Sequence, residues 1–137
     1  MKQQKTNEGG FSLIELLVAI TILSVGLFAL AEMQTIALKK TSISHNISVA
    51  TSLAQEVMDD VLAYDPSNPK LNSSQTFNYI FDPTTNATSI QVAGAGSLSA
   101  TVTTTINTPA IGTTWIVVTV TGSGIQPVTL AGFKRVV

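Results

Sequence analysis

Residues 11–31 form a long apolar segment in which only Glu15 is charged. At about 1.5 Å of rise per residue, a helix of this length spans roughly 30 Å, which is the thickness of the hydrocarbon core of a bilayer. The segment therefore predicts a membrane-spanning helix. A carboxylate costs about 2.5 to 3.5 kcal/mol at the centre of such a helix, and less near the interface, so Glu15 needs a partner.

The residues before the apolar segment have the features of a leader that is removed. Lys2 and Lys5 make it basic, and Gly9 and Gly10 end it. In an ordinary secretory signal peptide the small residues of the cleavage site follow the apolar block. Here they precede a longer block, so cleavage after Gly10 leaves the apolar helix in the mature chain. The basic residues predict that the leader, residues 1–10, stays in the cytoplasm while the rest is exported.

The run from Gly10 to Glu15 reads Gly-Phe-Ser-Leu-Ile-Glu, and with the apolar span it resembles the leader and helix start of type IV pilins and type II secretion pseudopilins. The resemblance implies that a prepilin peptidase cleaves between Gly10 and Phe11 and methylates the new amine of Phe11. It also implies that Glu15 pairs with the N-terminal ammonium of a neighbouring subunit in a helical filament. In a low-dielectric helix bundle these two charges attract strongly, and either is costly to leave unpaired.

Within that superfamily, residues 9–34 are similar to PilV-type minor pilins and to their relatives, the GspI-type pseudopilins. The resemblance implies a low-abundance subunit of a type IV pilus that primes assembly and influences adhesion. Such a subunit lies in the bacterial inner membrane as a single-pass protein with a periplasmic C-terminus. It then joins other pilins in a cell-surface filament through an inner-membrane assembly platform. Two alternatives remain open: a pseudopilin of a secretion or DNA-uptake system, and a permanently anchored periplasmic binding module.

After the span the helix is expected to continue and to become amphipathic over residues 32–63. Apolar residues recur at spacings of three, four and seven, which places them on one face of a helix that would pack on a sheet. They are Ile36, Ile43, Ile47, Ala50, Ala54, Val57 and Val61. Pro66 and Pro69 stop this pattern. One helix is therefore predicted over residues 11–63.

The second half of the chain, residues 64–137, is expected to form a loop and an antiparallel sheet of three or four strands. The sheet would pack on the C-terminal half of the helix, which gives an α+β fold and the pilin fold that the resemblance implies. Residues 64–87 are rich in Asn, Ser, Pro and Thr, as is typical of a loop. Alternating apolar and β-branched residues favour strands. The segments are 98–106, 113–121 and 127–137, with shorter candidates at 77–81 and 89–92.

The residues that could support chemistry do not form a recognisable catalytic or metal-binding pattern. His45 is the only histidine and there is no cysteine, which excludes thiol chemistry and thiolate metal sites. We expect His45 to be a solvated residue on a polar helical face. Adjacent Asp59 and Asp60 point about 100° apart on a helix, so they are expected at a solvated helix end or in contact with another subunit. Tyr79 and Phe81 are candidates for an interaction patch.

Charge also limits the possible partners. Seven Lys and Arg against eight Asp and Glu give a net charge of −1, which does not favour general nucleic-acid binding. The sequence as a whole predicts a structural protein and not an enzyme, with no cofactor, no metal and no small-molecule substrate.

Overall fold

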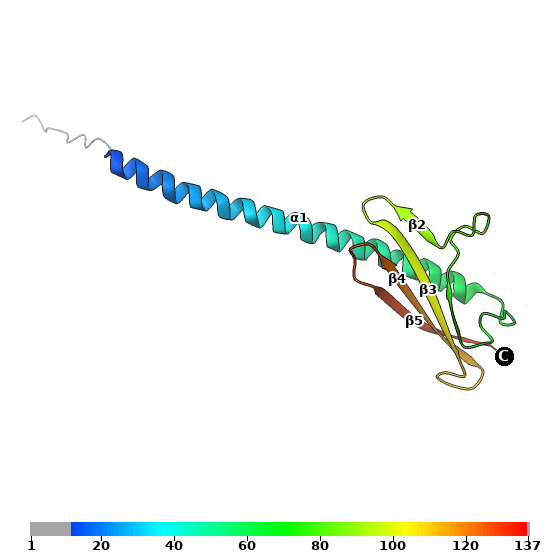
Figure 1. Ribbon diagram of the computed structural model, residues 1–137. Helices are drawn as coiled ribbons and strands as arrows, with labels where there is room; N and C mark the ends of the chain where they lie inside the picture. The colour runs from blue at the N-terminus through cyan, green and yellow to red at the C-terminus, as the bar shows by residue number, and fades with distance from the viewer. Residues whose placement is uncertain (1–11, 137) are drawn as a thin grey trace, which may run out of the picture. The chain divides into compact units, whose positions relative to one another are not determined.

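The computed structural model describes residues 12–136 of the 137-residue chain. Its elements, in chain order, are helix α1 (Leu13–Ala63) and strands β1 (Gln75–Asn78), β2 (Ser89–Val92), β3 (Gly96–Ile106), β4 (Thr113–Gly122) and β5 (Val128–Arg135) (Figure 1). The chain divides into two compact units, Met1–Lys40 and Thr41–Val137, and the boundary falls within α1. The predicted α+β fold class is confirmed, and the arrangement is consistent with the pilin fold.

Helix α1 begins and ends close to the predicted positions. The amide of Leu16 donates to the carbonyl of Ser12 at 3.1 Å, which closes the first turn. The helix ends at Ala63, three residues before Pro66. Gly26, which costs about 1 kcal/mol relative to alanine inside a helix, does not interrupt it. Phe11, the predicted first residue, lies outside the described residues.

The C-terminal part of α1 packs on the sheet through six buried side chains. They are Ala50, Leu53, Ala54, Val57, Met58 and Val61, and all belong to the core cluster of the second unit. The predicted apolar stripe is therefore right from Ala50 onward. It is wrong for Ile36, Ile43 and Ile47, which are 49%, 49% and 38% exposed. The first buried residue of α1 is Ala50. The apolar spacing of the helix therefore extends further toward the N-terminus than its contact with the sheet.

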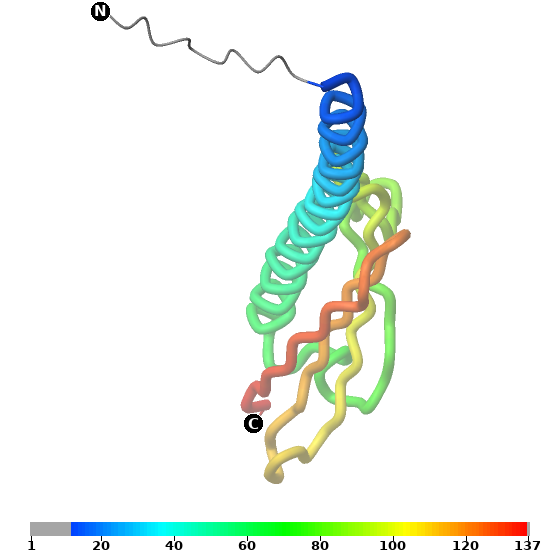
Figure 2. The backbone as a smooth tube through the Cα atoms, turned by 90° about the vertical axis from the view of Figure 1, so that its left-hand side faces the viewer, coloured from blue at the N-terminus to red at the C-terminus, as the bar shows by residue number. Residues whose placement is uncertain are grey.

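The sheet is antiparallel throughout, with strand order β1-β3-β4-β5 (Figure 2). Strand β2 also pairs with β3, so β1 and β2 lie one after the other along the same edge of that strand. Among the described residues the sheet therefore has five strands, where three or four were expected. The two short candidates both become strands because β3, with 11 residues, is long enough to pair with each over four residues.

Strands β3 and β4 supply most of the sheet's contribution to the core. Their buried apolar residues alternate along each strand and face α1: Leu98, Ala100, Val102, Ile116, Val118 and Val120. Trp115 and Val117, on the opposite face, are half-buried, so β4 is covered in part on both faces. Ile106 continues this alternation but is 38% exposed at the end of β3.

Two threonines take core positions that the apolar pattern missed. Thr104 donates to the carbonyl of Ser73 at 2.9 Å, and Thr114 donates to the carbonyl of Leu71 at 2.8 Å. Both are buried, and a buried hydroxyl is tolerated when it is hydrogen-bonded. These bonds attach the loop that follows α1 to the sheet.

Candidate functional site

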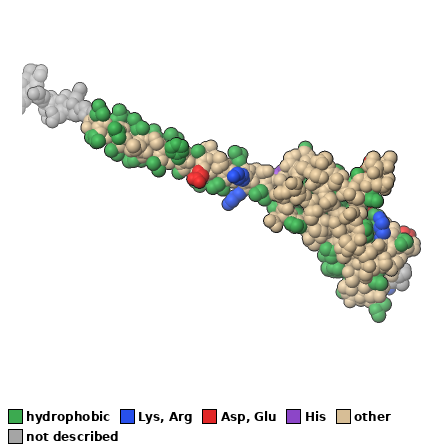
Figure 3. Space-filling view, in the orientation of Figure 1, with side chains coloured by type: hydrophobic (Ala, Val, Ile, Leu, Met, Phe, Trp, Pro, Cys, Tyr) green, Lys and Arg blue, Asp and Glu red, His purple; other side chains and the backbone are tan. Residues whose placement is uncertain are grey.

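The N-terminal part of α1 exposes its apolar side chains on every side. Within the apolar span Leu13 is 81% exposed and Phe28 is 78% exposed. An 18-residue window of this helix has a mean hydropathy of 2.5, and none of it is buried. Figure 3 shows these side chains covering the visible face of the segment. Water-soluble proteins rarely leave so large an apolar surface uncovered, so this part of the helix is built to be covered by a membrane or by other helices.

Two hydroxyl side chains inside the span, those of Thr21 and Ser24, are satisfied within the helix itself. Thr21 donates to the carbonyl of Val18 at 2.7 Å, and Ser24 donates to the carbonyl of Ile20 at 2.7 Å. Such bonds to the preceding turn remove the need for water around a hydroxyl. The helix can therefore enter a bilayer without leaving these two hydroxyls unpaired.

Glu15 is different, because no described residue can neutralise it. It lies in the first turn of α1 and is exposed. Its carboxylate is favourably placed with respect to the helix dipole, which is positive at this end. The next basic residue along the helix is Lys39, 24 residues and about 36 Å away. Any ion pair that Glu15 forms with a basic group at short range therefore involves a group outside residues 12–136.

The predicted cleavage and methylation site, Gly10 and Phe11, lies outside the described residues. Both remain predictions. The helix that follows them is regular from Leu13 onward.

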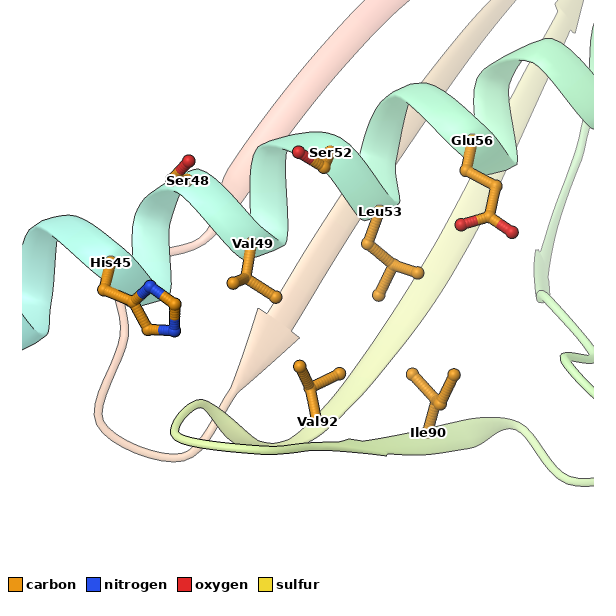
Figure 4. Close-up of a pocket in the computed structure, with 8 residues that line it drawn as sticks. All are labelled: His45, Ser48, Val49, Ser52, Leu53, Glu56, Ile90 and Val92. Atoms are coloured by element: carbon orange, nitrogen blue, oxygen red, sulfur yellow. The ribbon is translucent and has the colours of Figure 1, made fainter.

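His45 lines an open hollow of about 350 Å³ between α1 and β2 (Figure 4). Val49 and Leu53 on the helix and Ile90 and Val92 on the strand give the hollow an apolar lining. Among the described residues no group of three or more histidines and carboxylates is close enough to hold a metal ion. Ser48, Ser52 and Glu56 on the helix add polar groups to this lining.

Asp60 and the two expected patch residues meet at the C-terminal end of α1. The Tyr79 hydroxyl donates to a carboxylate oxygen of Asp60 at 2.8 Å, and the Tyr79 ring contacts the edge of Phe81 with centroids 5.1 Å apart. Lys70 lies 4.8 Å from the centre of the Phe77 ring, within the range of a cation–π interaction. Tyr79 and Phe81 are half-buried, so they hold the loop onto the helix more than they form an open patch.

The Asp60–Tyr79 contact predicts a specific loss of stability at alkaline pH. Burial, followed by the hydrogen bond to Asp60, raises the pKa of Tyr79 above its ordinary value of 10.0. The folded state therefore keeps a proton that the unfolded state loses above about pH 10, and stability falls as the pH rises further. We expect Tyr79→Phe to flatten the fall in the urea midpoint above about pH 10. An unchanged pH dependence would contradict this assignment.

A lysine from the last strand caps the helix, and the sequence patterns gave no sign of it. The ammonium of Lys134 donates to the carbonyls of Leu62 and Tyr64. Cations at a helix C-terminus satisfy its unpaired carbonyls and interact well with its dipole. Lys134 lies 72 residues from Leu62 and 70 residues from Tyr64 in the sequence. Local spacing therefore cannot reveal this contact.

We expect Lys134→Met to destabilise the second unit by about 1 to 3 kcal/mol, since it removes hydrogen bonds from a charged donor. The adjacent Arg135 is exposed, so Arg135→Met is a matched control with an expected effect within about 0.5 kcal/mol. Urea unfolding of the full chain in detergent, followed through the circular dichroism of the sheet, measures both. Equal effects of the two variants would show that the cap contributes nothing.

Comparison with known proteins gives one match. A model of the prokaryotic N-terminal methylation motif matches residues 5–31, which are fewer than half of the chain. A search of curated proteins and a search of solved structures found no match. The matched segment includes Gly10, Phe11 and Glu15. It supports a type IV pilin-like prepilin that prepilin peptidase processes, and it fits membrane anchoring of the chain before assembly.

Proposed function

We propose that this chain is a minor pilin, a structural subunit that prepilin peptidase cleaves between Gly10 and Phe11 and methylates at Phe11. It then enters a type IV pilus through its N-terminal helix. The observation that carries the proposal is the position of the methylation motif, residues 5–31. The motif includes the exposed apolar part of α1, and the same helix continues to Ala63 in the sheet-bearing unit.

The two environments of the apolar helix correspond to two stages of one process. Before assembly the bilayer covers its side chains, and after assembly other helices cover them. Moving from lipid to a helix bundle keeps the apolar surface out of water, so the transfer needs a specific interaction to favour the bundle. The carboxylate of Glu15 supplies one when it meets the N-terminal ammonium of a neighbouring subunit, because opposite charges attract strongly at low dielectric.

We propose a minor subunit and not the main filament protein because residues 9–34 are similar to PilV-type sequences. The presence of Glu15 fits a subunit that has a neighbour on which to register. The second unit would then lie outside the helical core, and packing without any disulfide would hold its sheet, since the chain has no cysteine.

Shearing of filaments from intact cells tests this function. The processed chain is expected in the sheared fraction at a small fraction of the level of the main pilin, and it should be missing from that fraction in cells without prepilin peptidase. If the chain stays with the inner membrane while filaments form normally without it, a secretion pseudopilin or a permanent anchor replaces the minor-pilin assignment.

A further inference from the structure

The C-terminal end of α1 and the loops that flank β1 line a second open hollow, of about 400 Å³. This volume lies in the range of small-molecule sites in proteins. All residues of the lining belong to the second unit. We call this site the tyrosine hollow. Its chemistry comes from six side chains, those of Asp60, Tyr64, Lys70, Tyr79, Phe81 and Asn86.

Aromatic rings form the apolar part of this lining. The rings of Tyr79 and Phe81 meet edge to face, at 72° to each other and with centroids 5.1 Å apart. Tyr64 follows the last residue of the helix and, like the other two, is half-buried. An aromatic ring presents a flat apolar face that carries a partial negative charge. Such a face suits a ligand with a flat side covered by C–H groups.

Polar groups of both charges share the hollow with these rings. The Asp60 carboxylate accepts a hydrogen bond from the Tyr79 hydroxyl at 2.8 Å, and a carboxylate has about four acceptor positions, so it can accept more. The Lys70 ammonium lies 5.7 Å from the centre of the Tyr64 ring and has three N–H groups to donate. The amide of Asn86, at an exposed position, can both donate and accept.

The two tyrosine hydroxyls of the hollow stay protonated well above neutral pH. Burial, followed by the nearby Asp60 carboxylate, raises the pKa of Tyr64 above its ordinary value of 10.0. Burial and the hydrogen bond to the same carboxylate raise the pKa of Tyr79 as well. The hydroxyls therefore add no charge to the lining, which holds one negative group, Asp60, and one positive group, Lys70.

This balance of charge selects the class of ligand. An anion would meet the carboxylate of Asp60, and a cation would meet the ammonium of Lys70, since both line the same hollow. A wholly apolar ligand would leave these polar groups without partners, which costs free energy. A neutral ligand with several hydroxyls avoids each of these costs, because every hydroxyl can both donate and accept.

We infer that the tyrosine hollow binds a neutral sugar in its ring form. Two adjacent hydroxyls of the sugar donate to the Asp60 carboxylate, and another hydroxyl accepts from Lys70. The C–H side of the sugar ring stacks on the aromatic rings, and Asn86 offers a further hydrogen bond. The inference goes beyond the proposed function and is independent of it, because the hollow lies wholly in the second unit and not in the apolar span.

Titration of the isotope-labelled full chain, followed by NMR in a detergent without a sugar headgroup, tests the inference. The probes are glucose, galactose, mannose and N-acetylglucosamine, each as the free sugar and as its methyl glycoside. We expect at least one of them to shift the aromatic resonances of Tyr64, Tyr79 and Phe81 in a saturable way. The expected Kd is about 0.1 to 10 mM, because so small a ligand makes few contacts.

Two substitutions with matched chemistry show whether the carboxylate binds the sugar. Asp60→Asn keeps the size of the side chain and removes its charge, and it is expected to raise Kd at least about fivefold. Asp59→Asn is the control, since Asp59 is the adjacent residue on α1, is exposed and does not line the hollow. We expect it to change Kd by less than about twofold.

A third variant separates loss of a sugar contact from disturbance of the Asp60–Tyr79 contact. Asn86→Gly removes the amide and tolerates the positive φ of 54° at this position. It is expected to raise Kd about threefold while the Tyr79 resonances of the free chain stay unchanged. An unchanged Kd for both Asn86→Gly and Asp60→Asn would overturn the inference.

The comparison of free sugars with methyl glycosides identifies the source of the sugar. Equal binding of the two forms supports the inference for the end of a glycan chain, whose anomeric oxygen is also substituted. Binding of the free form alone supports it for a free monosaccharide.

Two further results would overturn the inference. One is the absence of a saturable shift with every sugar probe up to about 50 mM. The other is tighter binding, at the same resonances, of inorganic phosphate, tetramethylammonium or glycine, which represent an anion, a cation and a ligand with both charges.

Discussion

Replacing Glu15 with alanine is expected to leave a processed chain in the inner membrane and to lower its amount in sheared filaments at least tenfold. The variant span is more apolar, so the bilayer holds it better, while the bundle loses the carboxylate that pairs with a neighbour's ammonium. Leaving one member of a buried charge pair alone costs about 3 to 5 kcal/mol. Since about 1.4 kcal/mol already corresponds to a factor of ten, a tenfold loss is a modest expectation.

Quantitative immunoblots of the membrane and sheared fractions measure this effect. Glu15→Gln is the matched variant, because it keeps the shape of the side chain and removes the charge. We expect it to fail as alanine does. Filaments that incorporate Glu15→Ala at the level of the unchanged chain would show that the carboxylate has no part in registration.

Replacing Gly10 with valine is expected to block leader cleavage almost completely. A glycine before the scissile bond lets the peptidase approach the backbone closely, and a β-branched side chain obstructs that approach. The uncleaved chain keeps residues 1–10 with Lys2 and Lys5, so Phe11 has no free amine to offer a neighbour. The block in cleavage should change the gel mobility of the chain, and the chain should be missing from the sheared fraction.

Gly26 provides the control for Gly10, because it lies in the apolar span that follows Gly10 and a Cβ added there meets no atom within 4 Å apart from the helix's own backbone. Gly26→Ala should be processed normally. If Gly10→Val is cleaved at the normal rate, the bond between Gly10 and Phe11 is not the processing site.

The main features of the fold follow from sequence periodicity. Three sequence patterns each predicted an element that the structure contains. They are the single charge in the span, the apolar stripe from Ala50 to Val61 and the alternation of residues 98–106. The stripe failed at Ile36, Ile43 and Ile47, because helical spacing reports which residues share a face and not where the packing partner ends. The predicted number of strands was too low, because the segments that pair with β3 are determined by the whole sheet and not by local spacing.

The candidate site was predictable where its chemistry is local. Glu15 is conspicuous as the only charge in an apolar segment, and the residues around it carry the resemblance to prepilins. Lys134 and the Asp60–Tyr79 pair were missed as contacts, since each joins residues that are far apart in the chain. Thr104 and Thr114 were missed as core residues because their hydroxyls are satisfied by loop carbonyls that no pattern identifies.

The mass of the mature N-terminal peptide, taken from the full chain purified from its native membrane, tests the central claim most directly. We expect a chain that begins at Phe11, carries one added methyl group on that amine and retains the whole of residues 11–31. A chain that still begins at Met1, or one that has lost the apolar segment together with the leader, would contradict it.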